Sequence, residues 1–279
     1  MSWQLNQIPK VLHVYWGNDK LPLMRYITVK SFSDLNPDWT IKFWVPRVKS
    51  ERLEKPWDGP NHKAYGDKSA TNCIDLLDDI PNLEICVFDF ESPFDDASDV
   101  YRSDFLRLDV LHSEGGFWAD MDIVFIKPME GLSFNGHNSL IQSIVCHSND
   151  DGFGGHSIGF LGASAGSMLF EELRDRSKML YKSHEYQAIG RLMFAKFCPQ
   201  RLIERDGRIF NFDRRIVYPF NFKDIRETIN NTSLEIPENT IGIHWYAGDA
   251  QLGSCCAHVT ADKIRAGRCV LYNEMRRFL

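Results

Sequence analysis

Two acidic side chains stand in the middle of a strongly apolar run. Asp120 and Asp122 are flanked by Phe117-Trp118-Ala119 on one side and by Ile123-Val124-Phe125-Ile126 on the other. In an extended chain, residues two apart point the same way, so the two carboxylates are expected to lie side by side. Like charges about 4 Å apart repel by roughly 4 kcal/mol at an effective dielectric near 20. The pair is therefore expected to hold a cation or to keep one carboxyl protonated.

The residue types around the pair limit which cation this is. The chain has neither an H-E-x-x-H motif nor a cysteine cluster, so nothing indicates zinc. Carboxylate oxygens, together with oxygens supplied by a substrate, suit Mg²⁺ or Mn²⁺. Such an ion keeps positions open for diphosphate oxygens and neutralises the charge that develops on a leaving nucleoside diphosphate. The pair thus favours metal-assisted chemistry on a nucleotide.

A third carboxylate lies on the apolar side of the clearest predicted helix, which spans Ser98 to Glu114. At about 100° per residue, Asp104 falls inside the arc of large side chains, and Arg107 lies at its edge. A carboxylate buried without a partner costs several kcal/mol. An internal pair with Arg107 at spacing i, i+3 and a ligand-binding role both remain open. The arc consists of Tyr101, Phe105, Leu108, Leu111 and His112.

The elements that must position these residues alternate between strands and helices. A strand at 11–16, a helix at 22–32 and a strand at 39–45 predict a βαβ unit with a parallel sheet. Gly115-Gly116 is expected to end the helix at 98–114, because a C-cap favours positive φ. The other expected elements are a short helix at 70–79, strands at 86–88, 139–146, 157–163, 208–218 and 240–246, and helices at 167–182 and 185–197.

Composition excludes several classes of protein. The 279 residues contain 32 Lys and Arg against 38 Asp and Glu, which gives a net charge of −6. This charge argues against a nucleic-acid-binding protein, which needs a basic surface to neutralise phosphates. No run approaches the roughly 18–20 apolar residues of a transmembrane segment, and the N-terminus does not resemble a secretory signal. Seven cysteines form no recognisable disulfide framework. We expect a cytoplasmic location and no transmembrane segment.

Several segments carry a family resemblance. The block from Ser103 to Asp122 resembles the motif S-D-x-x-R…L…G-G-x-(aromatic)-x-D-x-D of glycosyltransferases with a DXD-containing sugar-binding region. That family includes yeast initiating mannosyltransferases and large clostridial glucosylating toxins. Ile8 to Gly17 resembles the family's opening I-P-K-x-I-H-x-x-W, and residues 244–249 stand where the family has H-x-W-x-x-S-W. The resemblance extends from about residue 8 to residue 250.

The resemblance implies a fold and a division of the chain. The fold would be α/β, of the GT-A type: a Rossmann-like nucleotide-sugar-binding fold with a mixed, mostly parallel sheet flanked by helices. We expect residues 1–279 to form a single GT-A-like domain with a helical insertion around 167–198.

The resemblance also implies roles for particular residues. Tyr15, Trp16 and Gly17 would contact the nucleoside. Asp104 and Arg107 would hold the donor sugar and its phosphate side, and Asp120 would bind the ribose and the sugar. Asp122 would bind Mn²⁺ or Mg²⁺, with Asp120, His244 and Asp249 as further candidate ligands. Asp249 and Ala250 replace the family's Ser and Trp, which puts the clamp over the donor in doubt.

The predicted function is a metal-dependent glycosyltransferase, a hexosyl- or pentosyltransferase, that uses a UDP- or GDP-sugar and a glycan, lipid-linked or protein acceptor. The resemblance implies retention of anomeric configuration, in which the departing diphosphate takes the acceptor proton. Inversion would need a base, and Asp150, Asp151 and Asp249 are the candidates. One alternative is a phosphohydrolase of the haloacid dehalogenase type with Asp120 as nucleophile. Another is a catalytically inactive protein that binds sugar nucleotides.

Overall fold

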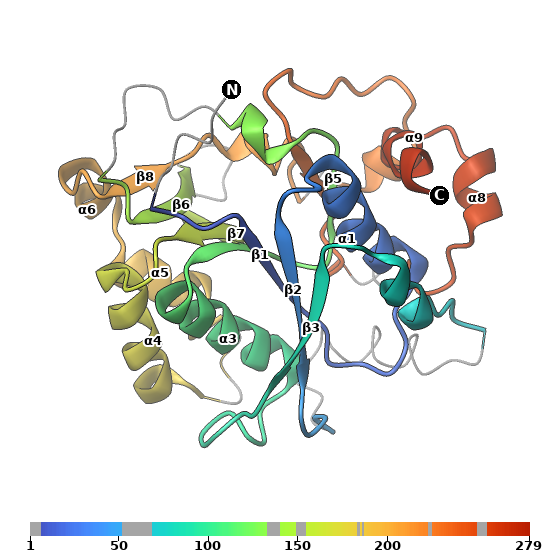
Figure 1. Ribbon diagram of the computed structural model, residues 1–279. Coiled ribbons are helices and arrows are strands. Elements are labelled where there is room, and N and C mark those ends of the chain that lie inside the picture. The colour runs from blue at the N-terminus through green and yellow to red at the C-terminus, as the bar shows by residue number, and fades with distance from the viewer. Residues whose placement is uncertain are drawn as a thin grey trace.

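A seven-stranded sheet forms the centre of the computed structural model, which describes residues 7–51, 69–132, 140–148, 155–182, 185, 187–222, 225–249 and 256–279 (Figure 1). β7 is antiparallel to both of its neighbours, and the other neighbouring strands pair in parallel. The expected mixed, mostly parallel sheet is confirmed. In spatial order the strands are β3 (Leu83–Phe88), β2 (Thr40–Pro46), β1 (Val11–Tyr15), β4 (Gly116–Ala119), β7 (Gly155–Ala163), β6 (Ser143–Ser148) and β8 (Ile209–Asn211).

A two-stranded antiparallel sheet continues the apolar run that contains the acidic pair. It consists of β5 (Ile123–Phe125) and β9 (Gly242–His244). In its register Ile123 lies opposite His244. The first residue after the acidic pair therefore pairs with a segment about 120 positions later in the chain.

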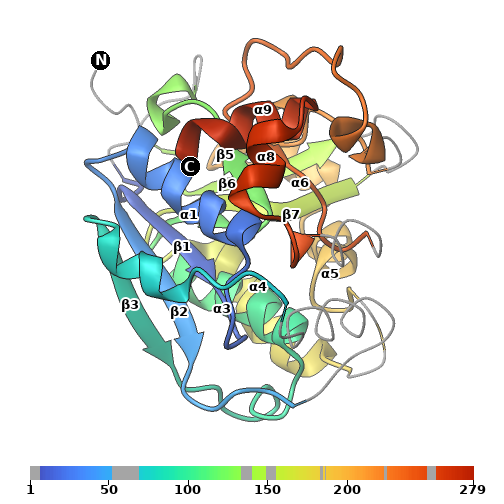
Figure 2. The same cartoon turned by 90° about the vertical axis from the view of Figure 1, so that its right-hand side faces the viewer.

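Helices cover both faces of the central sheet (Figures 1 and 2). On one face, α1 (Leu23–Leu35) packs over inward-facing side chains such as Leu12 and Phe117. α9 (Val270–Met275) packs on α1, and α8 (Ala261–Ala266) packs on α9. On the other face, α3 (Asp99–Ser113), α4 (Met168–Leu180), α5 (Arg191–Phe197) and α6 (Gln200–Arg205) pack over side chains such as Trp118 and Leu161. Neighbouring residues Phe117 and Trp118 thus belong to opposite cores, as alternation along a strand requires.

Two glycines turn the chain from α3 into β4. Gly115 and Gly116 have φ values of +73° and +99°, as a C-cap predicts. A Cβ at Gly115 would lie 2.5 Å from the backbone nitrogen of Ala165, so no other residue fits there. The carbonyl of Gly115 also contacts Nε2 of the buried His13 at 2.8 Å. This tight turn brings the acidic pair after β4 back toward the buried face of α3.

Several predicted boundaries were wrong. The strand expected at 208–218 ends at Asn211, because the Asp213 carboxylate accepts a hydrogen bond from the Arg215 backbone and starts a 3-10 turn, η3 (Arg214–Ile216). The helix expected from 185 begins only at Arg191, after Gln187 with φ of +67°. The short helix expected at 70–79 is η1 (Ile74–Asp79). The remaining 3-10 segments are η2 (Met129–Gly131), η4 (Ile225–Ile229) and η5 (Arg276–Phe278).

The stretch 167–198, expected as a helical insertion, contains α4 and α5. Among the described ranges, no helix combines the length and the apolar character needed to cross a bilayer.

Candidate active site

The acidic pair lies in the turn between β4 and β5, so its two residues follow the strand end instead of continuing the strand. Three neighbouring segments fix the backbone of this turn. The Asp120 amide donates to the carbonyl of Gly159 at 2.7 Å, and the Thr28 hydroxyl donates to the carbonyl of Met121 at 3.0 Å. The Trp245 amide donates to the carbonyl of Asp122 at 2.9 Å. The turn is therefore held by β7, by α1 and by the segment after β9.

Arg107 connects the two carboxylates nearest α3. Its Nη1 lies 3.0 Å from Oδ1 of Asp104, and its Nη2 lies 2.9 Å from Oδ1 of Asp120. The guanidinium carbon is 5.2 Å from the centre of a Trp118 ring, within cation–π range. Burial lowers the pKa of Arg107, but Asp120 and Asp104 outweigh it and raise that pKa above its usual value. The buried Asp104 thus has the partner that its place on the helix requires, and the same arginine extends the pairing to Asp120.

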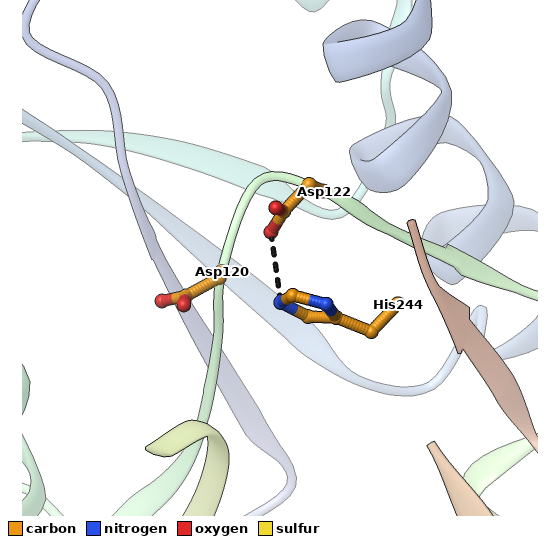
Figure 3. A group of neighbouring side chains, drawn as sticks. All are labelled: Asp120, Asp122 and His244. Atoms are coloured by element: carbon orange, nitrogen blue, oxygen red, sulfur yellow. Dashed lines mark ion pairs between the residues drawn. The ribbon is translucent and has the colours of Figure 1, made fainter. Parts of the chain in front are cut away.

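Asp122 and His244 form the other half of the site, and Figure 3 shows both beside Asp120. Oδ1 of Asp122 lies 3.2 Å from Nε2 of His244, and Oδ2 accepts a hydrogen bond from the Ala247 amide at 2.7 Å. Burial raises the pKa of the Asp122 carboxyl. His244, Arg25 and the Ala247 amide together lower it by more than burial raises it, so the net pKa lies below its usual range. Asp122 is therefore an ionised carboxylate.

These three side chains have the composition of a divalent metal site. One ligand atom from each of Asp120, Asp122 and His244 lies within 4.8 Å of the others. Nδ1 of His244 is buried without a hydrogen-bond partner among the described residues, so only Nε2 faces the carboxylates. A Cβ added at Gly159 would lie 2.8 Å from Oδ2 of Asp120 and 3.1 Å from Nε2 of His244. Glycine in β7 therefore leaves open the space that an ion between these ligands needs.

Asp249, also expected as a metal ligand, has a different neighbour. Its buried carboxylate accepts a hydrogen bond from Arg226 at 2.9 Å, and it is outside the group of three close ligand atoms. Ala250, at the position of the family's Trp, lies outside the described residues, as do the candidate bases Asp150 and Asp151.

The N-terminal turn expected to contact the nucleoside is largely buried. The Tyr15 hydroxyl donates to Oδ1 of Asp99 at 2.7 Å, and the Trp16 indole donates to the carbonyl of Lys20 at 2.9 Å. Burial and the nearby Asp99 raise the pKa of Tyr15 far above its usual value, so the phenol stays protonated. A Cβ at Gly17 would collide with the Asp99 carboxylate at 2.2 Å, so Gly17 is required for the turn to approach α3.

A cavity of about 560 Å³ opens beside the acidic pair and His244. Part of its wall comes from positions for which the sequence analysis gave no site role. Gln187 and Arg191 reach it from the start of α5, where the Gln187 side chain accepts a hydrogen bond from the Arg191 amide at 2.9 Å. The positive φ of Gln187 has no signature in the sequence, so nothing local indicated this contribution. The remaining polar and aromatic lining includes Ser148, His156, Ser157, Arg214, Tyr218, Phe222 and Tyr246.

A family model matches part of the chain. Residues 25–144 match the family model described as the glycosyltransferase sugar-binding region containing DXD motif. None of the curated proteins matches the chain. The matched region contains Asp104, Arg107, Asp120 and Asp122, and it ends before His244.

Solved glycosyltransferase structures align with most of this chain at low sequence identity. The glycosyltransferase GlyE of Streptococcus pneumoniae TIGR4 aligns with a TM-score of 0.51 and 10% identity, over 97% of this chain and 60% of GlyE. The PaToxG glycosyltransferase aligns with a TM-score of 0.48 and 15% identity, over 97% of this chain and 87% of that one. The galactosyltransferase LgtC, in complex with donor and acceptor sugar analogs, aligns with a TM-score of 0.45 and 12% identity, over 91% of this chain and 99% of LgtC.

Residues 25–144 therefore match the DXD-containing sugar-binding region of glycosyltransferases, the chain has a GT-A-type α/β fold, and the family resemblance seen in the sequence is confirmed.

Proposed function

We propose that the protein is a metal-dependent glycosyltransferase that moves a sugar from a nucleotide diphosphate sugar to a carbohydrate or glycoconjugate acceptor. One observation carries the proposal. The three close ligand atoms of Asp120, Asp122 and His244 line a cavity of about 560 Å³, next to the buried Asp104–Arg107–Asp120 network. A divalent ion and a donor sugar would bind there next to each other.

The metal side of the proposal rests on the chemistry of the ligands. Asp122 and His244 would hold the ion, with Asp120 as a third ligand. A mixed set of carboxylate and imidazole ligands favours Mn²⁺ over Mg²⁺, because Mg²⁺ prefers oxygen ligands alone. When bound, the ion would neutralise negative charge on the diphosphate leaving group. The chain's own part is to keep Asp122 ionised and fixed, through the Ala247 amide and His244.

The donor-sugar side of the proposal rests on the Arg107 network. Arg107 orients the carboxylates of Asp104 and Asp120, so that both can accept hydrogen bonds from sugar or ribose hydroxyls. A Cβ added at Gly190 would lie 3.1 Å from Oδ2 of Asp104, which shows that the segment before α5 closely approaches this carboxylate. The proposed donor sugar would bind between α3, the acidic pair and this segment.

The acceptor would bind at the aromatic part of the cavity. Ring centres of Phe222 and Tyr246 are 5.6 Å apart, and those of Tyr246 and His244 are 4.3 Å apart. Aromatic side chains suit the apolar faces of sugar rings, and Arg191 and Arg214 add donors for acceptor oxygens. This wall adjoins the proposed metal ligand His244, as transfer to a bound acceptor requires.

We further propose that transfer retains the anomeric configuration, with the departing diphosphate accepting the acceptor's proton. Retention by this route needs no protein base next to the acceptor. In an inverting reaction Asp150, Asp151 or Asp249 would act as the base. The carboxylate of Asp249 is paired with Arg226, and the other two residues lie outside the described part of the chain. Proton NMR of the first product formed distinguishes the two outcomes.

The proposal is tested by donor hydrolysis. The protein is incubated with a panel of UDP- and GDP-sugars, with Mn²⁺ or with EDTA, and release of nucleoside diphosphate is measured. We expect Mn²⁺-dependent release from at least one donor. Phosphate release from a phosphomonoester without nucleoside diphosphate release would instead indicate a phosphohydrolase using Asp120. Thermal stabilisation by a nucleotide sugar, without hydrolysis or transfer, would indicate an inactive binding protein.

A further inference from the structure

Helix α1 presents a buried polar stripe to the turn that carries the acidic pair. Arg25, Thr28 and Ser31 follow one another at three-residue intervals, which places them on one side of the helix. Arg25 is 9% exposed, and Thr28 and Ser31 are fully buried. Polar residues are seldom buried unless they bind a partner, so this stripe must have a task other than filling the core.

Two members of the stripe bind the backbone on either side of Asp122. The Thr28 hydroxyl donates to the carbonyl of Met121 at 3.0 Å, and the Ser31 hydroxyl accepts from the amide of Phe125 at 3.0 Å. α1 is thus attached to the acidic turn before Asp122 and to β5 after it.

Arg25, at the start of the stripe, contacts two tryptophan rings. Its guanidinium carbon is 5.3 Å from the centre of the Trp16 ring and 5.0 Å from that of the Trp245 ring. Trp16 follows β1, and Trp245 follows His244 at the end of β9. A planar guanidinium can contact aromatic rings on both of its faces, and cation–π contacts strengthen when they are removed from water. Arg25 also contributes positive charge near the Asp122 carboxylate.

We propose that Arg25 is a positioning residue for the metal side of the site. By binding Trp16 and Trp245 together, it fixes the His244–Trp245 segment against the acidic turn and against the N-terminal turn. The structural role of Arg25 does not depend on the proposed function. Only its consequence does, namely that Asp122 and His244 are positioned to bind an ion. Arg25 itself is not assigned a contact with substrate.

The first test needs no metal and no substrate. Amide hydrogen exchange is compared between the wild type and Arg25→Met, which retains a long apolar side chain but loses both cation–π contacts. We expect exchange in peptides covering 119–125 and 241–249 to become about tenfold faster, with little change in the core strands β1 and β2. Arg25→Lys keeps the charge but loses the planar group, so its exchange rates in these peptides should lie between those of the wild type and of Arg25→Met.

Lys30→Met serves as the matched control, because it removes one positive charge from the same helix. Lys30 is partly exposed and pairs with Asp34 four residues on, away from the stripe. It should leave exchange in both peptides unchanged. A uniform increase in exchange across the protein in Arg25→Met, or no increase in these two peptides, would overturn the proposal, because Arg25 would then only fill space.

The second test measures the consequence. Mn²⁺ binding, followed by electron paramagnetic resonance, should weaken by about tenfold in Arg25→Met and remain unchanged in Lys30→Met. Absence of Mn²⁺ binding in the wild type would contradict the metal-dependent function but not the role of Arg25, which the exchange experiment decides separately. Faster local exchange with unchanged Mn²⁺ affinity would show that Arg25 does not position the ligands.

Discussion

Nη2 of Arg107 donates to Oδ1 of Asp120 at 2.9 Å and thereby joins α3 to the turn after β4. The Trp118 indole donates to the same oxygen at 2.8 Å. Oδ2 of Asp120 has no hydrogen-bond partner among the described residues, and it is the oxygen that faces Gly159 and the His244 side. One oxygen of this carboxylate therefore binds Arg107 and Trp118, and the other is available for the proposed ion.

Substitution of Gly159 by alanine should therefore impair activity without unfolding the protein. The new methyl group would lie 2.8 Å from Oδ2 of Asp120 and 3.1 Å from Nε2 of His244, in the space proposed for the ion. We expect donor hydrolysis to fall at least about tenfold, since sub-ångström displacement of ligands is poorly tolerated at such sites. Gly207→Ala, where a Cβ meets nothing within 4 Å, is the control. Equal activities of the two variants would contradict the placement of the ion.

Asp122→Asn should abolish Mn²⁺-stimulated turnover and leave the fold intact. The amide oxygen can still accept the hydrogen bond from the Ala247 amide, but the negative charge needed for the ion is lost. A decrease of at least about 100-fold in nucleoside diphosphate release is expected, with an unchanged circular dichroism spectrum. Near-normal turnover in this variant would exclude Asp122 as a metal ligand.

Removal of the metal should lower the thermal stability of the wild type. A ligand that binds only the folded state stabilises it by about 2.7 kcal/mol at 100 times its Kd. We expect the Tm measured in Mn²⁺ to exceed that in EDTA, and the difference to disappear in His244→Asn and in Asp122→Asn. A Tm difference that persists in both variants would place the ion elsewhere in the protein.

Arg107→Met should be among the most destabilising single substitutions in the chain. It leaves the carboxylates of Asp104 and Asp120 without their shared cation, and loss of one partner from a buried ion pair typically costs about 3–5 kcal/mol. Arg176→Met removes an exposed pair with Glu172 on α4 and should cost at most about 1 kcal/mol. Urea denaturation gives both values, and similar losses in the two variants would show that the Arg107 network is structurally unimportant.

Stability should fall as the pH drops from neutral toward 4. Burial lowers the pKa of His13 and of His156 to about 4, whereas the unfolded chain has ordinary values near 6.5. Between these values the unfolded state binds more protons, so the free energy of unfolding decreases by about 2 kcal/mol per histidine from pH 6.5 to pH 5. Urea denaturation across this range checks the slope. His13→Gln should have a shallower slope, and an unchanged slope would contradict the assignment of His13.

The part of the site that lies close together in sequence was predictable. Helical spacing placed Asp104 among large apolar side chains, and its burial beside Arg107 is confirmed. The apolar flanks of Asp120 and Asp122 likewise indicated acids that share a site. These signals exist because a helix or a strand imposes a period that the spacing of apolar and polar residues along the sequence reveals.

The rest of the site depends on contacts between distant segments. His244 joins the acids only because β9 pairs with β5, and nothing near residue 244 specifies that register. Gly159 faces Asp120 because β7 pairs with β4, and an isolated glycine in a strand does not show what approaches it. Gln187 and Arg191 reach the cavity through a loop with positive φ, which sequence patterns did not indicate.

The pairing of β5 with β9 also bears on the order in which the proposed metal ligands become available during translation. A ribosome releases both aspartates long before residues 242–244 emerge, so an incomplete polypeptide has a two-carboxylate turn without its imidazole. β9, the last strand in the described part of the chain, then completes the proposed ligand set. A polypeptide that stops before residue 242 would consequently lack the imidazole of the proposed metal site, and we expect it to bind the ion weakly.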